Sequence, residues 1–123
     1  MIGSLMIRVS VVILLAGMLA GIVMGIQQDF RLAAAHAHFN LVGGVLLFLF
    51  GLYYKLFPAA GNSGLAKLQG WLHIAGAILF PAGVAVVIVK GTSFIIAPIV
   101  GSLIVVAAMA LFAVIVFKVT RLT

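Results

Sequence analysis

The sequence predicts an all-α integral membrane protein that crosses the bilayer four times. Two observations carry this prediction. Of the 123 residues, 67% are apolar and only 7% are charged, whereas an average soluble domain is about 45–50% apolar and about 25% charged. The apolar residues also form four long runs rather than the short alternating strands of an outer-membrane barrel. A water-soluble globule and a barrel are both excluded, and residues 1–123 are expected to form one four-helix transmembrane domain.

Each apolar run is bounded by charged or turn-forming residues and is long enough, at about 1.5 Å per helical residue, to cross roughly 30 Å of hydrocarbon. The expected spans are about 9–26, 32–54, 68–89 and 94–117. The first run is longer than the apolar segment of a signal peptide, which has about 7–15 residues, so it is expected to be a retained helix.

The basic residues predict the orientation of the four spans. An even number of crossings places both termini on the same side as the loop between the second and third spans. That side carries five Lys and Arg residues, and the other side carries only Arg31 and Lys90, partly offset by Asp29. By the positive-inside rule, both termini are expected to be cytoplasmic.

Three histidines are the polar residues of greatest interest, because all of them lie within expected spans, where polar groups are costly and are candidates for function. His36 and His38 enter the second span near the outer interface. His73 enters the third span from the opposite face, so it is not expected to share a metal with the pair.

The spacing of His36 and His38 is informative about the kind of site. Two residues correspond to about 200° of rotation on an α-helix, so the two rings should point to opposite flanks and serve two separate sites. A zinc site on one helix would instead use ligands four residues apart. The spacing fits a helix that stands between two haems and gives one axial ligand to each.

Three residues near the pair are further candidates for cofactor binding. Asn40 lies one turn from His36 on the same face, and Gly43 is expected to open room along the helix. Arg31, near the outer interface, is placed to pair with a haem propionate. Each has a structural alternative, since the histidines can bond backbone carbonyls or Asn40, and Arg31 can serve as an interface anchor.

The histidine pair belongs to a longer pattern in residues 36–76. The second span carries His36-Ala-His38, then a Gly-x-x-Tyr-x-x-x-Pro segment that ends at Pro58, and the third span carries His73 near its start. This pattern resembles the catalytic subunit (subunit I) of the haem–copper oxidase superfamily, above all the cbb-type cytochrome c oxidases and the nitric oxide reductases. The first and fourth spans share only length and hydrophobicity with that family.

The resemblance implies roles for these residues and a place in a larger architecture. His36 would correspond to the ligand of the high-spin haem and His38 to a ligand of the low-spin haem, whereas His73 would match a family histidine that is not an axial ligand. The family subunit has twelve helices arranged as three arcs of four. This chain resembles one arc, a third of that subunit, without the segments that hold copper, so no copper and no complete terminal oxidase are expected.

Three copies of the chain would rebuild the twelve-helix ring. In such a homotrimer each pore receives His36 of one protomer and His38 of its neighbour, which gives one bis-histidine haem b per protomer. We therefore expect a b-type cytochrome of the bacterial cytoplasmic (inner) membrane that passes electrons from quinol or a periplasmic donor to another carrier. Because two histidines fill the iron, neither oxygen nor nitric oxide should be reduced.

Two other functions stay open at this point. The chain could be a non-catalytic accessory or structural membrane protein whose histidines only pack, or a copper- or proton-handling membrane protein that uses the same histidines. The scattered basic residues form no patch for nucleic acid. The absence of cysteine excludes thiolate-bound metals, and the single acid, Asp29, excludes paired-carboxylate catalysis within one protomer.

Overall fold

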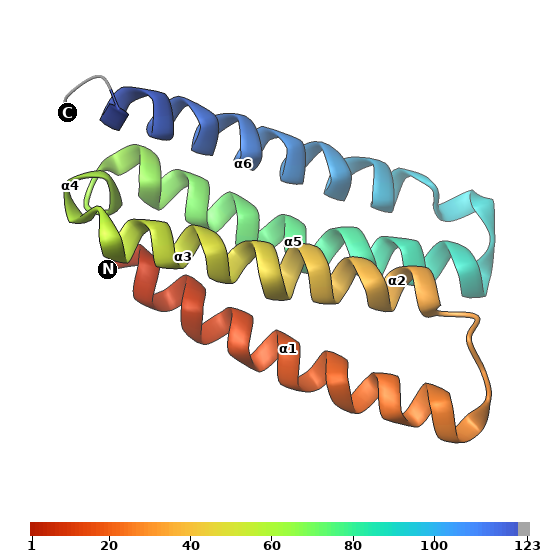
Figure 1. Cartoon of the computed structure of the whole chain (residues 1–123). Coiled ribbons are helices and arrows are strands. Elements are labelled where there is room, and N and C mark those ends of the chain that lie inside the picture. Colours follow the sequence, from red (N-terminus) through yellow and green to blue (C-terminus); the bar gives the residue numbers. More distant parts are fainter. Residues whose placement is uncertain (121–123) are drawn as a thin grey trace.

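The computed structural model describes residues 1–120, and these residues form helices joined by short turns, with no strand among them (Figure 1). The elements are α1 (Ile2–Gln27), α2 (Ala33–His38), the π-helix η1 (Phe39–Leu46), α3 (Leu47–Leu56), α4 (Pro58–Gly61), α5 (Gly64–Lys90), the 3-10 turn η2 (Thr92–Phe94) and α6 (Ile96–Thr120). Helices α2, η1 and α3 are continuous and form one span. The four spans are long and apolar enough to cross a membrane, which confirms the predicted fold class. The chain is a multi-pass membrane protein.

The helices extend beyond the apolar runs from which they were predicted. Helix α1 begins at Ile2 and α5 at Gly64, several residues earlier than the hydropathy indicates. The ends are set by backbone hydrogen bonding and capping instead. The Ser63 side chain accepts a hydrogen bond from the backbone N–H of Ala66 at 3.1 Å and so caps α5. Gly91, with φ of 98°, ends the same helix in a conformation that favours glycine.

The four spans lie in chain order, each beside the next (Figure 1). Helix α1 packs on α3 and η1, this second span packs on α5, and α5 forms the most extensive interface of all with α6. Within residues 1–120, α1 and α6 share no comparable interface. The arrangement is therefore an open row of helices rather than a closed four-helix bundle, in which the first and last helices would also pack together.

The two ends of this row are packed differently. We call the end with Ile2, α4 and the last turns of α6 the termini end, and the end with residues 28–32 and η2 the loop end. The core lies toward the termini end, where Met6, Phe50 and Tyr54 are fully buried or nearly so. Phe112 of α6 joins it, with its ring centroid 4.3 Å from that of Phe50. The buried residues of α1 end at Gly17, so the loop end is the less tightly packed one.

A π-helix directly follows the histidine pair, and hydropathy gave no sign of it. It contains Gly43 and Gly44, both buried against α1: an added Cβ at Gly43 would meet Ile13, and one at Gly44 would meet Leu14. Short π segments are rare and frequently lie at functional sites. Here the segment changes the register of the second span immediately after His38.

Candidate functional site

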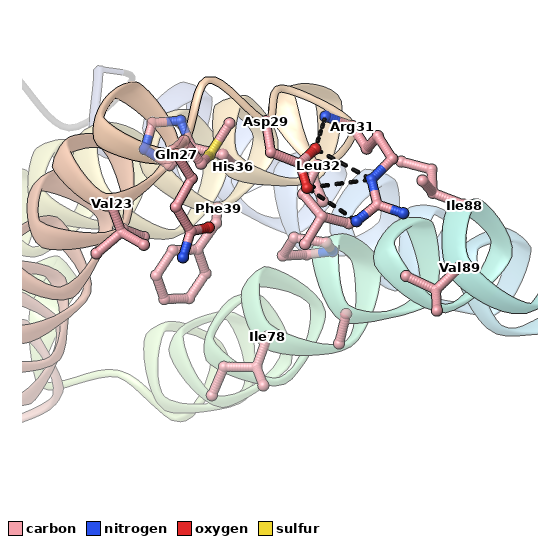
Figure 2. Close-up of a pocket in the computed structure, with 15 residues that line it drawn as sticks. Val23, Gln27, Asp29, Arg31, Leu32, His36, Phe39, Ile78, Ile88 and Val89 are labelled. Carbon is pink, nitrogen blue, oxygen red and sulfur yellow. Dashed lines mark hydrogen bonds and ion pairs between the residues drawn. The ribbon is translucent and has the colours of Figure 1, made fainter.

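A partly open cavity of about 650 Å³ lies between α1, α2 and α5 at the loop end (Figure 2). Its walls are mostly apolar and include Phe39 and Ile78. Its polar side chains are Gln27, Asp29, Arg31 and His36. The volume falls within the range of about 300–1,000 Å³ that is usual for small-molecule and cofactor sites. Such a cavity suits a largely apolar ligand that carries a polar or charged edge.

His36 faces α1 and is held by two neighbours. Its Nε2 lies 2.7 Å from the Gly17 carbonyl oxygen and 2.9 Å from Nδ2 of Asn40. A ring nitrogen of neutral imidazole carries either a hydrogen or a lone pair, so Nε2 can satisfy only one of these partners at a time. Asn40 Oδ1 is buried and has no hydrogen-bond partner among the described residues. The polar groups around His36 are therefore incompletely satisfied.

His38 faces α5 and is oriented by its own helix. Its Nδ1 lies 2.8 Å from the carbonyl oxygen of Ala34, and its ring packs edge-on against Phe80 with centroids 4.7 Å apart. Because a carbonyl only accepts hydrogen bonds, Nδ1 carries the hydrogen, and in the neutral ring Nε2 keeps the lone pair. Metal-binding histidines commonly have this tautomer, in which one N–H bonds a carbonyl and the other nitrogen binds the metal.

The two rings thus contact different helices, α1 for His36 and α5 for His38, as their two-residue spacing predicts. The structure places only some of the predicted cofactor-binding residues near His36. Asn40 does lie on the same face as His36 and bonds it. Gly43 does not line the cavity, because it is buried between Ile13 and the backbone of Ala77, where its lack of a Cβ allows close packing.

Arg31 stands at the cavity with Asp29 in an exposed ion pair, whose closest atoms, Nη2 and Oδ2, are 2.8 Å apart (Figure 2). The Arg31 side chain also donates from Nε, and its backbone N–H donates to Oδ1 of Asp29. These hydrogen bonds lower the pKa of the Asp29 carboxyl below its ordinary value of 3.8. Arg31 therefore presents a guanidinium at the edge of the cavity, and the ionised Asp29 balances its charge.

His73 is fully buried in α5, away from the cavity, and sequence reasoning did not foresee its partners. Its Nε2 lies 2.9 Å from the Val42 carbonyl oxygen in η1, and its ring packs edge-on against Phe50. One turn earlier on α5, Gln69 accepts a hydrogen bond from the Tyr54 hydroxyl at 2.9 Å. Gln69 and His73 are four residues apart, and this spacing in the sequence could have predicted that the two side chains lie on the same face of the helix.

Within residues 1–120, no group of three or more histidine or acidic side chains is arranged to hold a metal ion. No protein-family model, curated protein or solved structure matches the chain. The similarity to haem–copper oxidases is thus a prediction that rests on the motifs of residues 36–76.

Proposed function

We propose that the protein is a b-type haem protein of the bacterial inner membrane, with cytoplasmic termini, that transfers electrons near the outer face. The observation that carries the proposal is the placement of the two histidines. They lie on different sides of one helix, and one of them lines an apolar cavity of cofactor size. A haem bound there would supply one-electron chemistry at its iron, and the protein would supply ligands, orientation and a dry surrounding.

His38 fits the role of axial ligand in the conformation described, since its Nδ1 hydrogen is used by Ala34 and Nε2 keeps a lone pair. His36 needs one adjustment. Its Nε2 lies against the Gly17 carbonyl, so binding iron through Nε2 requires the ring to turn from α1 toward the cavity. Asn40, which also lies within hydrogen-bond distance of Nε2, remains beside the ring as a polar neighbour.

Arg31 supports the proposal through its remaining hydrogen-bond capacity. The guanidinium has five N–H donors, and Asp29 engages only Nε and Nη2. The donors on Nη1 are directed to no other group that the structure describes, so they can bind a second carboxylate such as a haem propionate. Asp29 would then stay in place and orient the guanidinium.

The open row of helices supports a homotrimer in which each haem occupies the partly open cavity of one protomer and is shared with the next protomer. A bis-histidine site needs two imidazoles, but His36 and His38 of one chain face different helices and cannot both bind one iron. Cyclic symmetry solves this by pairing His36 of one protomer with His38 of the next, which gives three identical sites. Quinol or a periplasmic carrier would be the electron donor.

Absorption spectra of the air-oxidised and dithionite-reduced protein in detergent test the proposal. We expect a Soret band that shifts on reduction and a pyridine haemochrome ratio of about one haem b per chain. His36→Ala and His38→Ala should each remove the haem, whereas His73→Asn should retain it because His73 does not line the cavity. A protein that stays colourless after incubation with haem would contradict the proposal.

A mixing experiment tests the sharing of ligands between protomers. In a trimer that contains both His36→Ala and His38→Ala chains, one of the three pores pairs an intact His36 with an intact His38. Random co-assembly of equal amounts should therefore restore about a quarter of the wild-type haem content. If both ligands came from one chain, the mixture would contain no haem.

A second candidate function is favoured by a different observation. All three imidazoles lie within hydrogen-bond distance of a backbone carbonyl oxygen, which is how histidines stabilise helix contacts in a protein without a cofactor. The chain would then be an accessory membrane subunit. A colourless protein whose His36→Ala and His38→Ala variants unfold more easily would favour this function.

A further inference from the structure

Three polar side chains in the core at the termini end have no part in the function proposed above. Tyr54, Gln69 and His73 are each completely buried. Tyr54 donates its hydroxyl hydrogen to Gln69 Oε1 at 2.9 Å, and the His73 ring bonds the Val42 carbonyl at 2.9 Å. Two atoms of this group, Gln69 Nε2 and His73 Nδ1, are buried without a hydrogen-bond partner among the described residues.

The bonds already formed determine what these two atoms can accept or donate. The Val42 carbonyl only accepts, so His73 Nε2 carries the hydrogen and Nδ1 presents a lone pair. Gln69 receives the Tyr54 hydroxyl at Oε1, so its Nε2 presents N–H donors. One turn of α5 separates the two residues, which places their Cβ atoms about 5–6 Å apart. A donor and an acceptor thus lie near each other in the membrane interior.

We propose that Gln69 and His73 bind one water molecule that accepts a hydrogen bond from Gln69 Nε2 and donates one to His73 Nδ1. An unpartnered buried polar group costs about 1–3 kcal/mol, and a buried water typically has two to four such partners. A metal cation would be repelled by the amide hydrogens, and an anion by the lone pair of Nδ1. If the Gln69 amide were turned over, its Oε1 would face the site in place of Nε2. A water would then donate one O–H to Oε1 and the other to His73 Nδ1.

The water completes a hydrogen-bonded chain that runs from Tyr54 through Gln69 and His73 to Val42. It holds His73 in the tautomer that donates to Val42, and Val42 lies in η1, directly after the histidine pair. Side chains that bond helix carbonyls are a known cause of local departures from α-helical geometry. The site is thus a support for the π-helix, and it depends on no part of the haem proposal.

Nuclear magnetic resonance of the protein in lipid nanodiscs, with nitrogen-15 in histidine and glutamine, tests this site. We expect His73 to be protonated at Nε2 and bare at Nδ1, and magnetisation to pass from water to both the His73 ring and the Gln69 amide. Gln69→Leu should reduce the transfer from water to the His73 ring to the background of the measurement. Because the wild-type measurement already decides the question, a Gln69→Leu chain that fails to fold would not weaken the test.

Ser10→Ala provides the matched control. Ser10 is also completely buried, but its hydroxyl bonds Ile7 within its own helix, so its removal should leave the transfer to His73 unchanged. A wild-type protein in which His73 carries its hydrogen on Nδ1, or in which no magnetisation passes from water to His73, would overturn the proposal.

Discussion

The two ends of the helix row give their histidines opposite environments. At the termini end, α1, α3 and α5 pack so closely that His73 has no exposed surface and donates to a fixed carbonyl. At the loop end, His36 is only half-buried, lines a cavity, and has two competing neighbours at the same nitrogen. The comparison teaches that burial alone does not mark a ligand site. A histidine available for binding needs adjacent space and hydrogen bonds that can be exchanged.

The largest expected effect concerns the packed end. Phe50 is 2% exposed and contacts both His73 and Phe112, whereas its neighbour Leu49 is 52% exposed. Phe50→Ala should lower the free energy of unfolding by about 3–5 kcal/mol, because it leaves a cavity in the core. Leu49→Ala should change it far less. Unfolding in mixed micelles measures both, and equal losses would show that the termini end is not the packed core.

A pair of glycines in α1 compares a packed position with an open position along one helix. A Cβ at Gly17 would overlap the Asn40 side chain, while a Cβ at Gly25 would meet nothing within 4 Å. Gly17→Ala should destabilise the protein by about 1–3 kcal/mol through overpacking. Gly25→Ala should be neutral or stabilising by up to about 1 kcal/mol, since alanine favours helix. The same unfolding assay applies, and a destabilising Gly25→Ala would mean that the loop end of α1 is covered.

Filling the cavity tests whether the loop end is a binding site. Ile78 lines the cavity, and Ile99, of similar exposure, lies outside it. If the proposed haem occupies this cavity, Ile78→Trp should lower the haem content of the purified protein by about tenfold, because an overpacked site costs about 1–3 kcal/mol. Ile99→Trp should retain the haem. Pyridine haemochrome analysis gives the content, and unchanged occupancy in Ile78→Trp would place the haem elsewhere.

The smallest expected effect is a dependence on pH at the mouth of the cavity. The pKa of Asp29 is lowered by its bonds to Arg31, so the ion pair stabilises the folded state above pH 3.8 and loses this contribution as the pH falls through the lowered pKa. Both groups are exposed, so the change should be slight. Melting curves below pH 5 should show a smaller acid-dependent decrease in Asp29→Asn than in the wild type. An equal decrease in both proteins would contradict this assignment.

Much of the fold follows from the sequence, because hydrophobic runs and helical periodicity are local properties. The four spans were predicted correctly, and so was the divergence of His36 and His38, since two residues always turn an α-helix by about 200°. The helix ends were predicted less accurately. Those of α5, for example, are set by the Ser63 cap and by the backbone conformation of Gly91. The predicted neighbour of His36, Asn40, is also local, one turn away on the same helix.

The amino-acid order alone therefore determined an apolar, four-span chain with two imidazoles on opposite flanks of one helix. Tertiary packing decided the rest: that the spans form an open row, that a cavity lies beside His36, that Gly43 serves close packing, and that His73 reaches the Val42 carbonyl in the π-helix. These features depend on contacts such as that of His36 with Gly17, which join residues distant in the chain. No local pattern specifies which carbonyl a buried imidazole will reach, because that depends on how closely two separate helices approach.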